Sequence, residues 1–197
     1  MLALYCLFAL VLQLTGNAYA YEDYFMRVEA QIIRLENPQG LTASGRPCGG
    51  QFASRQCNTV VQAQIDTDVS NAVRGAQQYG GKSGSDYNYK VLSTSSDDND
   101  PHIGEVVSGD ICGQAIEKAV VRVRITDQGS SGEHRINDFI CESSLRSHYV
   151  LSVWSPVQLC QPEFQTTKMR LYFRYRVTRL ERNQCRNNVP FNKEYGY

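Results

Sequence analysis

The chain has 197 residues, and its 20 basic and 20 acidic side chains cancel to a formal net charge of zero. A neutral chain gives no electrostatic reason to expect a nucleic-acid partner, and this length suits one domain with a buried core. No internal repeat or coiled-coil heptad is visible, so we expect a single globular domain.

The first residues have the pattern of a secretory signal. Residues 2–14 are almost wholly apolar and uncharged, and Ala18-Tyr19-Ala20 supplies a small-residue cleavage pattern. About 13 apolar residues fall short of the roughly 20 that span a membrane. We therefore expect residues 1–20 to be removed and the protein to be secreted, with no transmembrane span in the mature chain. A retained anchor is the alternative, because the usual basic residues before the apolar run are missing.

Loss of the signal removes Cys6 and leaves six cysteines. In an exported chain an even count indicates up to three disulfides, and no C-x-x-C spacing favours zinc instead. Six cysteines allow 15 pairings, among which the sequence does not choose. The cysteines expected in disulfides are Cys48, Cys57, Cys112, Cys141, Cys160 and Cys185.

The first expected strand covers residues 24–32, where apolar and polar side chains alternate. Ile33 and Leu35 continue the apolar set on the opposite parity, which predicts a bulge near Ile32. A turn and a loop rich in Gly, Ser, Pro and Cys then lead to the next strand.

Alternation returns over residues 58–65 and predicts a second strand. Residues 67–85 are expected to form a long excursion, with a short helix over 68–76. Its Gly-Gly-Lys-Ser run resembles part of a phosphate-binding loop, but Ala76 stands where the first glycine of that motif is required. We therefore expect no nucleotide site.

Five further runs predict strands, and the last is the most regular, since its side chains alternate over most of ten residues. Seven or eight short strands between Gly, Asp, Ser and Pro clusters are typical of an all-β antiparallel sandwich. We expect about eight strands in one disulfide-stapled domain over residues 21–185, followed by a flexible tail over 186–197. The five runs are residues 87–93, 119–126, 134–140, 148–154 and 169–180.

No catalytic motif is present. The sequence has three histidines, His102, His134 and His148, but no Gly-x-Ser-x-Gly nucleophile elbow and no His-Glu-x-x-His pattern. The cysteines are better explained as disulfides. We expect no enzyme activity and no cofactor. A secreted hydrolase of an unrecognised family is a distant alternative.

Calcium is the one metal that the sequence suggests. The acidic turn with Asp97, Asp98 and Asp100 could offer oxygen ligands, joined by Asp66 and Asp68 after the second strand. The spacing does not match an EF-hand, and a solvated turn explains the same residues.

Four arginines alternate onto the outward faces of two expected strands. They are Arg122 and Arg124 on one strand, and Arg174 and Arg176 on another. If the two strands are neighbours, these side chains form a basic stripe for sulfated glycans or anionic lipid headgroups. An ordinary charged sheet face is the alternative.

Five segments follow one another along the chain: the opening strand, the Gly45-Arg-Pro-Cys-Gly-Gly50 loop, Cys57 leading into the strand over 58–65, the run over 149–155, and the closing run over 171–178. Together they resemble the N-terminal C2-like module of Notch ligands of the Delta and Serrate/Jagged type. The resemblance covers about residues 24–182. It implies an eight-stranded sandwich that contacts a receptor and binds lipids through apical loops, with calcium in some members. We expect no room after Cys185 for the modules that follow in those ligands.

We therefore expect a secreted, non-catalytic binding module that acts at the cell surface on a protein receptor, a lipid or a glycan. The resemblance implies a modulator or co-ligand of Notch-type signalling. The alternative is a structural component of an extracellular matrix or cuticle, suggested by the 12 tyrosines.

Overall fold

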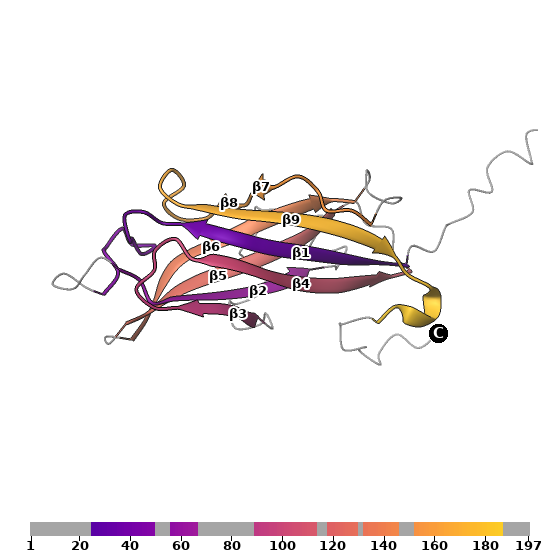
Figure 1. Cartoon of the computed structure of the whole chain (residues 1–197), viewed down its shortest axis with the longest axis horizontal. Coiled ribbons are helices and arrows are strands. Elements are labelled where there is room, and N and C mark those ends of the chain that lie inside the picture. The colour runs from indigo at the N-terminus through magenta and orange to yellow at the C-terminus, as the bar shows by residue number, and fades with distance from the viewer. Residues whose placement is uncertain are drawn as a thin grey trace, which may run out of the picture.

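The computed structural model describes residues 25–49, 56–66, 89–113, 118–129, 132–145 and 152–186. Within this part the chain forms nine strands in two antiparallel sheets, which lie face to face in Figure 1. No helix of the described part is long and apolar enough to cross a membrane. The prediction of an all-β antiparallel sandwich is confirmed.

The first sheet contains β1 (Phe25–Glu36), β4 (His102–Cys112), β7 (Gln158–Leu159) and β9 (Arg170–Arg179), in the order β4-β1-β9-β7. The second contains β2 (Thr59–Asp66), β3 (Lys90–Ser95), β5 (Lys118–Gly129), β6 (Gly132–Ser144) and β8 (Gln161–Pro162), in the order β3-β2-β5-β6-β8. A 3-10 turn, η2, follows at Arg182–Gln184.

The core is built by the inward rows of both sheets. On β9 the alternating side chains Leu171, Phe173, Tyr175 and Val177 are buried, and the same holds for every second residue of β1 and β5. A two-residue period along a strand places one set of side chains on the inner face, where burial stabilises the sandwich. In β1 the register shifts between Ile32 and Arg34, which confirms the predicted bulge.

All six predicted cysteines form disulfides. Cys48 pairs with Cys57, Cys112 with Cys185, and Cys141 with Cys160. The second of these joins the end of β4 to the segment after η2, and the third joins β6 to the residue between β7 and β8. Disulfides persist in oxidising compartments, so the three pairs indicate that this protein resides in one.

Strand β4 was not predicted from the sequence. Its inward residues Ile103, Val107 and Ile111 do keep an even spacing, but Gly104 and Gly109 interrupt the pattern with residues typical of turns. Gly104 has a φ of 70°, which a side-chain-bearing residue rarely adopts. Pairing with β1 along its length outweighs these local signals.

The strand predicted over residues 148–154 is wrong for its described part. Residues 152–157 run without strand pairing, and only Gln158 and Leu159 join β9 as β7. Pro156 lacks the N–H that a strand ladder requires. The expected signal over residues 1–20, the whole excursion over 67–85 and residues 187–197 of the expected tail lie outside the described residues.

Candidate binding surface

The outer face of the first sheet carries an ordered row of arginines and aromatic residues. Alternation along β9 turns Tyr172, Arg174 and Arg176 to the side opposite the core. In the register of the β1–β9 pair, Gln31 lies opposite Arg174 and Glu29 lies opposite Arg176. Each arginine therefore faces a polar side chain on the neighbouring strand.

Both arginines are held in place by these neighbours. Arg176 donates two hydrogen bonds to the Glu29 carboxylate, at 2.6 and 3.1 Å, which raise the pKa of Arg176. Arg174 donates to the Gln31 side-chain oxygen at 2.8 Å. Among the described residues, no carboxylate forms a salt bridge with Arg174. Arg174 is thus an oriented cation on a half-buried site.

Trp154 covers both guanidinium groups. Its ring centroid lies 4.9 Å from Cζ of Arg174 and 4.7 Å from Cζ of Arg176, which are cation–π distances. The adjacent Ser155 fixes this position. Its backbone N–H donates to the Tyr175 carbonyl at 2.7 Å, and its hydroxyl oxygen accepts the Tyr175 N–H at 3.0 Å.

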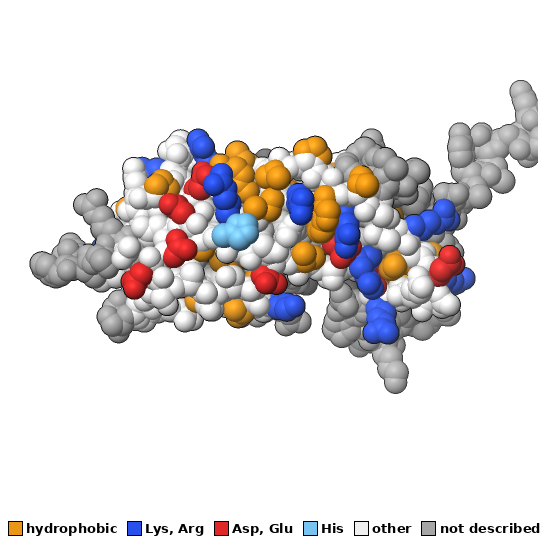
Figure 2. Space-filling view, viewed as in Figure 1, with side chains coloured by type: hydrophobic (Ala, Val, Ile, Leu, Met, Phe, Trp, Pro, Cys, Tyr) orange, Lys and Arg blue, Asp and Glu red, His pale blue; other side chains and the backbone are white. Residues whose placement is uncertain are grey.

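Three exposed apolar side chains lie close to Trp154 along the chain. Val153, Val157 and Leu159 are 55%, 54% and 56% exposed. Figure 2, which looks onto β1 and β9, shows hydrophobic and basic side chains interleaved over this face. We call the set Val153, Trp154, Val157, Leu159, Arg174 and Arg176 the tryptophan patch.

Elsewhere on this face, acidic and basic side chains form ion pairs with each other. Arg34 contacts Glu36 at 2.8 Å and stacks over Tyr172, and the Tyr172 hydroxyl donates to Glu36 at 3.0 Å. At the far end, Arg27 donates to both carboxylate oxygens of Asp110, at 2.7 and 3.1 Å. Acidic and basic groups are therefore interspersed across the sheet.

The Arg27–Asp110 pair makes stability depend on pH. Burial alone would raise the pKa of Asp110, but the hydrogen bonds from Arg27 and from the Arg186 N–H, with the charges of these arginines, lower it below its ordinary value. A carboxyl group whose pKa is lower in the folded state stabilises the fold above its unfolded pKa, and this contribution is lost as the pH falls through the folded pKa.

We expect Asp110→Asn to lower the free energy of unfolding by about 1 to 2 kcal/mol at neutral pH, a modest loss because solvent screens the part-exposed Arg27. The difference from wild type should shrink as the pH falls below the ordinary aspartate pKa of about 4 and on through the lower pKa of folded Asp110. Urea unfolding at several pH values measures it. If wild type and Asp110→Asn differ in free energy of unfolding by the same amount at pH 7 and pH 2.5, the charge of Asp110 does not stabilise the fold.

The predicted arginine stripe is not formed. Arg122 and Arg124 lie on β5 in the second sheet, whereas Arg174 and Arg176 lie on β9 in the first. Arg122 is on the outer side of β5 but is buried rather than exposed, and lies 3.9 Å from Asp66. The alternation placed these arginines off the core side correctly, but strand order across the two sheets has no local signature in the sequence.

Arg124 has partners of its own. Its Nε lies 3.3 Å from an oxygen of Asp138, which Arg135 also contacts at 3.0 Å, and its guanidinium lies over the Tyr89 ring at 4.8 Å. On the outer face of the second sheet, Arg124 and Arg135 are therefore paired with a carboxylate of the same sheet.

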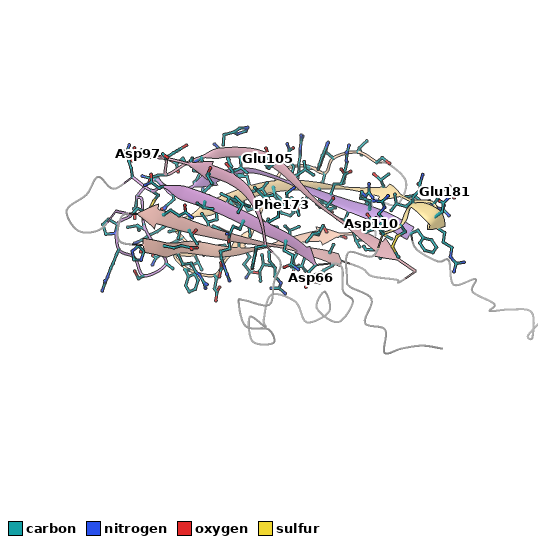
Figure 3. The ribbon with its side chains drawn as sticks, turned by 90° about the horizontal axis from the view of Figure 1, so that it is seen from below. Asp66, Asp97, Glu105, Asp110, Phe173 and Glu181 are labelled. Atoms are coloured by element: carbon teal, nitrogen blue, oxygen red, sulfur yellow. A yellow bond between two sulfur atoms is a disulfide. The ribbon has the colours of Figure 1, made fainter. Side chains whose placement is uncertain are left out.

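Asp66 is not brought to the acidic turn of Asp97, Asp98 and Asp100. Strand β2 starts beside the acidic turn, since Thr59 pairs with Ser95, and Asp66 lies at its other end, about 23 Å away at the rise of a strand. Figure 3 shows Asp66 and Asp97 well apart. Asp68 lies outside the described residues.

Within the acidic turn the oxygens bind backbone groups. Asp98 accepts the Asp100 N–H at 2.9 Å, and Asp100 accepts the Asn37 N–H at 2.6 Å. No group of three or more metal-ligating residues forms among the residues that the structure describes. This turn closes the end of the sandwich next to the Cys48–Cys57 loop, because Asn99 accepts the Cys57 N–H at 2.9 Å.

Comparison with known proteins finds the fold in solved structures. No protein-family model and no curated protein matches the chain. The crystal structure of a C2 domain protein from Ramazzottius varieornatus is 27% identical, with a TM-score of 0.69, over 83% of this chain and 94% of that one.

Two further matches are more distant. The structure of Drosophila C2-DSL-EGF1 has a TM-score of 0.50 at 13% identity, over 78% of this chain and 67% of that one. Human GIVD cytosolic phospholipase A2 has a TM-score of 0.50 at 12% identity, and the match covers 81% of this chain but only 17% of that protein. Similarity at this level concerns the fold alone. With its two antiparallel sheets and three disulfides, this chain has the fold of a C2 domain.

Proposed function

We propose that this protein is a secreted, non-catalytic binding domain that acts on the outer surface of cells. The tryptophan patch carries the proposal, because it leaves three apolar side chains more than half exposed beside an oriented Trp and two arginines. A folded domain rarely leaves such a group in water unless a partner covers it. The three disulfides support a location outside the cell.

A binding role also fits the placement of the histidines. His102 and His134 are exposed and lie on different sheets, and His148 lies outside the described residues. An acid–base or nucleophilic site needs such groups within hydrogen-bond reach of one another. These two side chains offer no shared centre.

The candidate partners are a protein receptor, a lipid and a glycan. C2 domains as a fold suggest a lipid or membrane surface, while the resemblance to Notch ligands suggests a modulator or co-ligand of Notch-type signalling. The match to Drosophila C2-DSL-EGF1 agrees with that resemblance in fold. Adding purified mature protein to Notch reporter cells tests the narrower proposal, which predicts a dose-dependent change in reporter output.

The broader proposal is tested by binding to live cells. Fluorescently labelled mature protein, produced with its disulfides intact, should bind a panel of cells saturably, and excess unlabelled protein should displace it. The protein should also be soluble and diffusible. Recovery only from an insoluble matrix, or binding that never saturates on any cell, would contradict a cell-surface binding domain and favour the structural alternative.

A further inference from the structure

The tryptophan patch differs in character from the other faces of the sandwich. Of the five large hydrophobic side chains that are exposed in the described part, Val153, Val157 and Leu159 belong to it, and Val106 lies on the same outer face. Val106 is paired in register with Gln31, which in turn lies opposite Arg174. Val106 and Leu159 therefore lie on the outer face of the first sheet on either side of β9, and Val153 and Val157 precede and follow Trp154, whose ring covers Arg174.

The patch is also rigid before any partner arrives. Trp154 is anchored through Ser155 to β9, and the two guanidinium groups are fixed by Glu29 and Gln31. A partner that docks here loses little entropy in ordering these side chains. Tryptophan, arginine and aliphatic residues in one fixed cluster are the composition of energetic hot spots in protein interfaces.

The charges around the patch distinguish between classes of partner. Glu29 and Glu36 lie on the same face and pair with Arg176 and Arg34, so these two arginines have less positive charge to offer phosphate headgroups or sulfated sugars. Val106 and Leu159 lie on strands β4 and β7, and the segment that carries Val153 and Val157 is held against β9 by the hydrogen bonds between Ser155 and Tyr175. Arg174, in contrast, has no carboxylate partner in the described part of the chain and can donate hydrogen bonds to a carboxylate of another protein.

We propose that the tryptophan patch docks a protein whose surface presents an apolar centre with at least one carboxylate placed to pair with Arg174. This inference rests on the proposed function and names its partner class. The Asp or Glu of the partner would receive hydrogen bonds from Arg174, while its apolar side chains cover Trp154, Val157 and Leu159. Salt should weaken the contact only in part, because the apolar contacts do not depend on ionic strength.

Four variants of the mature protein test the patch on the cells that bind wild type. Trp154→Ala and Arg174→Glu should each raise the Kd by about tenfold or more, and Val157→Ser by a few-fold. Val91→Ser is the matched control, because Val91 is also a valine and is 51% exposed, but lies on β3 in the other sheet. Its Kd should stay within about twofold of wild type. Circular dichroism and melting midpoints identify any variant that misfolds, and Arg174→Gln then replaces Arg174→Glu.

The partner class is tested with the same labelled proteins. Trypsin treatment of the cells should abolish wild-type binding, whereas vesicles of phosphatidylcholine with phosphatidylserine, and immobilised heparin, should retain none of it at physiological salt. If Trp154→Ala and Arg174→Glu bind cells with wild-type affinity, the tryptophan patch is not the binding surface, and the proposed function stands without it. Binding that survives trypsin and is reproduced on vesicles or heparin would overturn the protein partner. No binding to any cell would overturn the proposed function itself.

Discussion

Replacing Cys112 and Cys185 by serine should lower the free energy of unfolding by about 4 kcal/mol, since a link across 73 residues removes much of the freedom of the unfolded chain. Both cysteines are half-buried, so serine adds no large desolvation cost at either position. The loss should be visible as a lower urea midpoint. A loss of this size is a large fraction of the total free energy of unfolding of a single domain.

The single variants provide the control. Either Cys112→Ser or Cys185→Ser breaks the same link, so each alone should lose nearly as much stability as the double variant. Urea titration of all three, with the free thiol blocked in the single variants, measures the comparison. A double variant that loses less than about 1 kcal/mol, or single losses that add up to the double loss, would contradict the assigned role.

Phe173→Ala should cost about 3 to 5 kcal/mol, because it empties a large volume in the centre of the sandwich. The Phe173 side chain is 1% exposed, and its ring lies 6.3 Å from that of Tyr175 between their centroids. Figure 3 shows Phe173 in the interior between the sheets. Both sheets pack on it, so the gap cannot close without moving one of them.

The neighbouring residue is the matched control for this prediction. Tyr172 has a ring of similar size on the same strand but turns to the outer face, where its hydroxyl donates to Glu36. Tyr172→Ala should therefore cost only about 1 kcal/mol. Thermal or urea unfolding measures both variants. Equal losses for Phe173→Ala and Tyr172→Ala would mean that the alternation along β9 does not set which side of the sheet is the core.

Local sequence patterns were sufficient to predict the strands that have one apolar and one polar face. The alternation of β9 and the change of parity in β1 at Ile32 follow directly from the order of apolar and polar residues. The same logic failed for β4, where Gly104 and Gly109 hide a strand that pairing with β1 stabilises. Such pairing is a non-local contact, and no window of neighbouring residues contains it.

The candidate surface depended even more on non-local contacts. The sequence singled out Arg174 and Arg176 as outward cations, but it combined them with Arg122 and Arg124, which the topology places in the other sheet. Trp154 was assigned to a strand, whereas its place over the two arginines comes from Ser155 pairing with Tyr175, 20 residues away. A Pro two residues after a Trp, within an otherwise apolar run, was the only sequence signal that this segment leaves the ladder.

Hydroxyl-radical footprinting of the mature protein, free and bound to live cells, tests most directly whether the outer face of the first sheet is the binding surface. Oxidation at Trp154, Val157 and Leu159 should fall several-fold on binding, because aromatic and aliphatic side chains react in proportion to their exposure to water. Val91 on β3 should be oxidised equally in both samples. Unchanged oxidation of Trp154 and Leu159 in cell-bound protein, or protection at Val91 instead, would contradict the account.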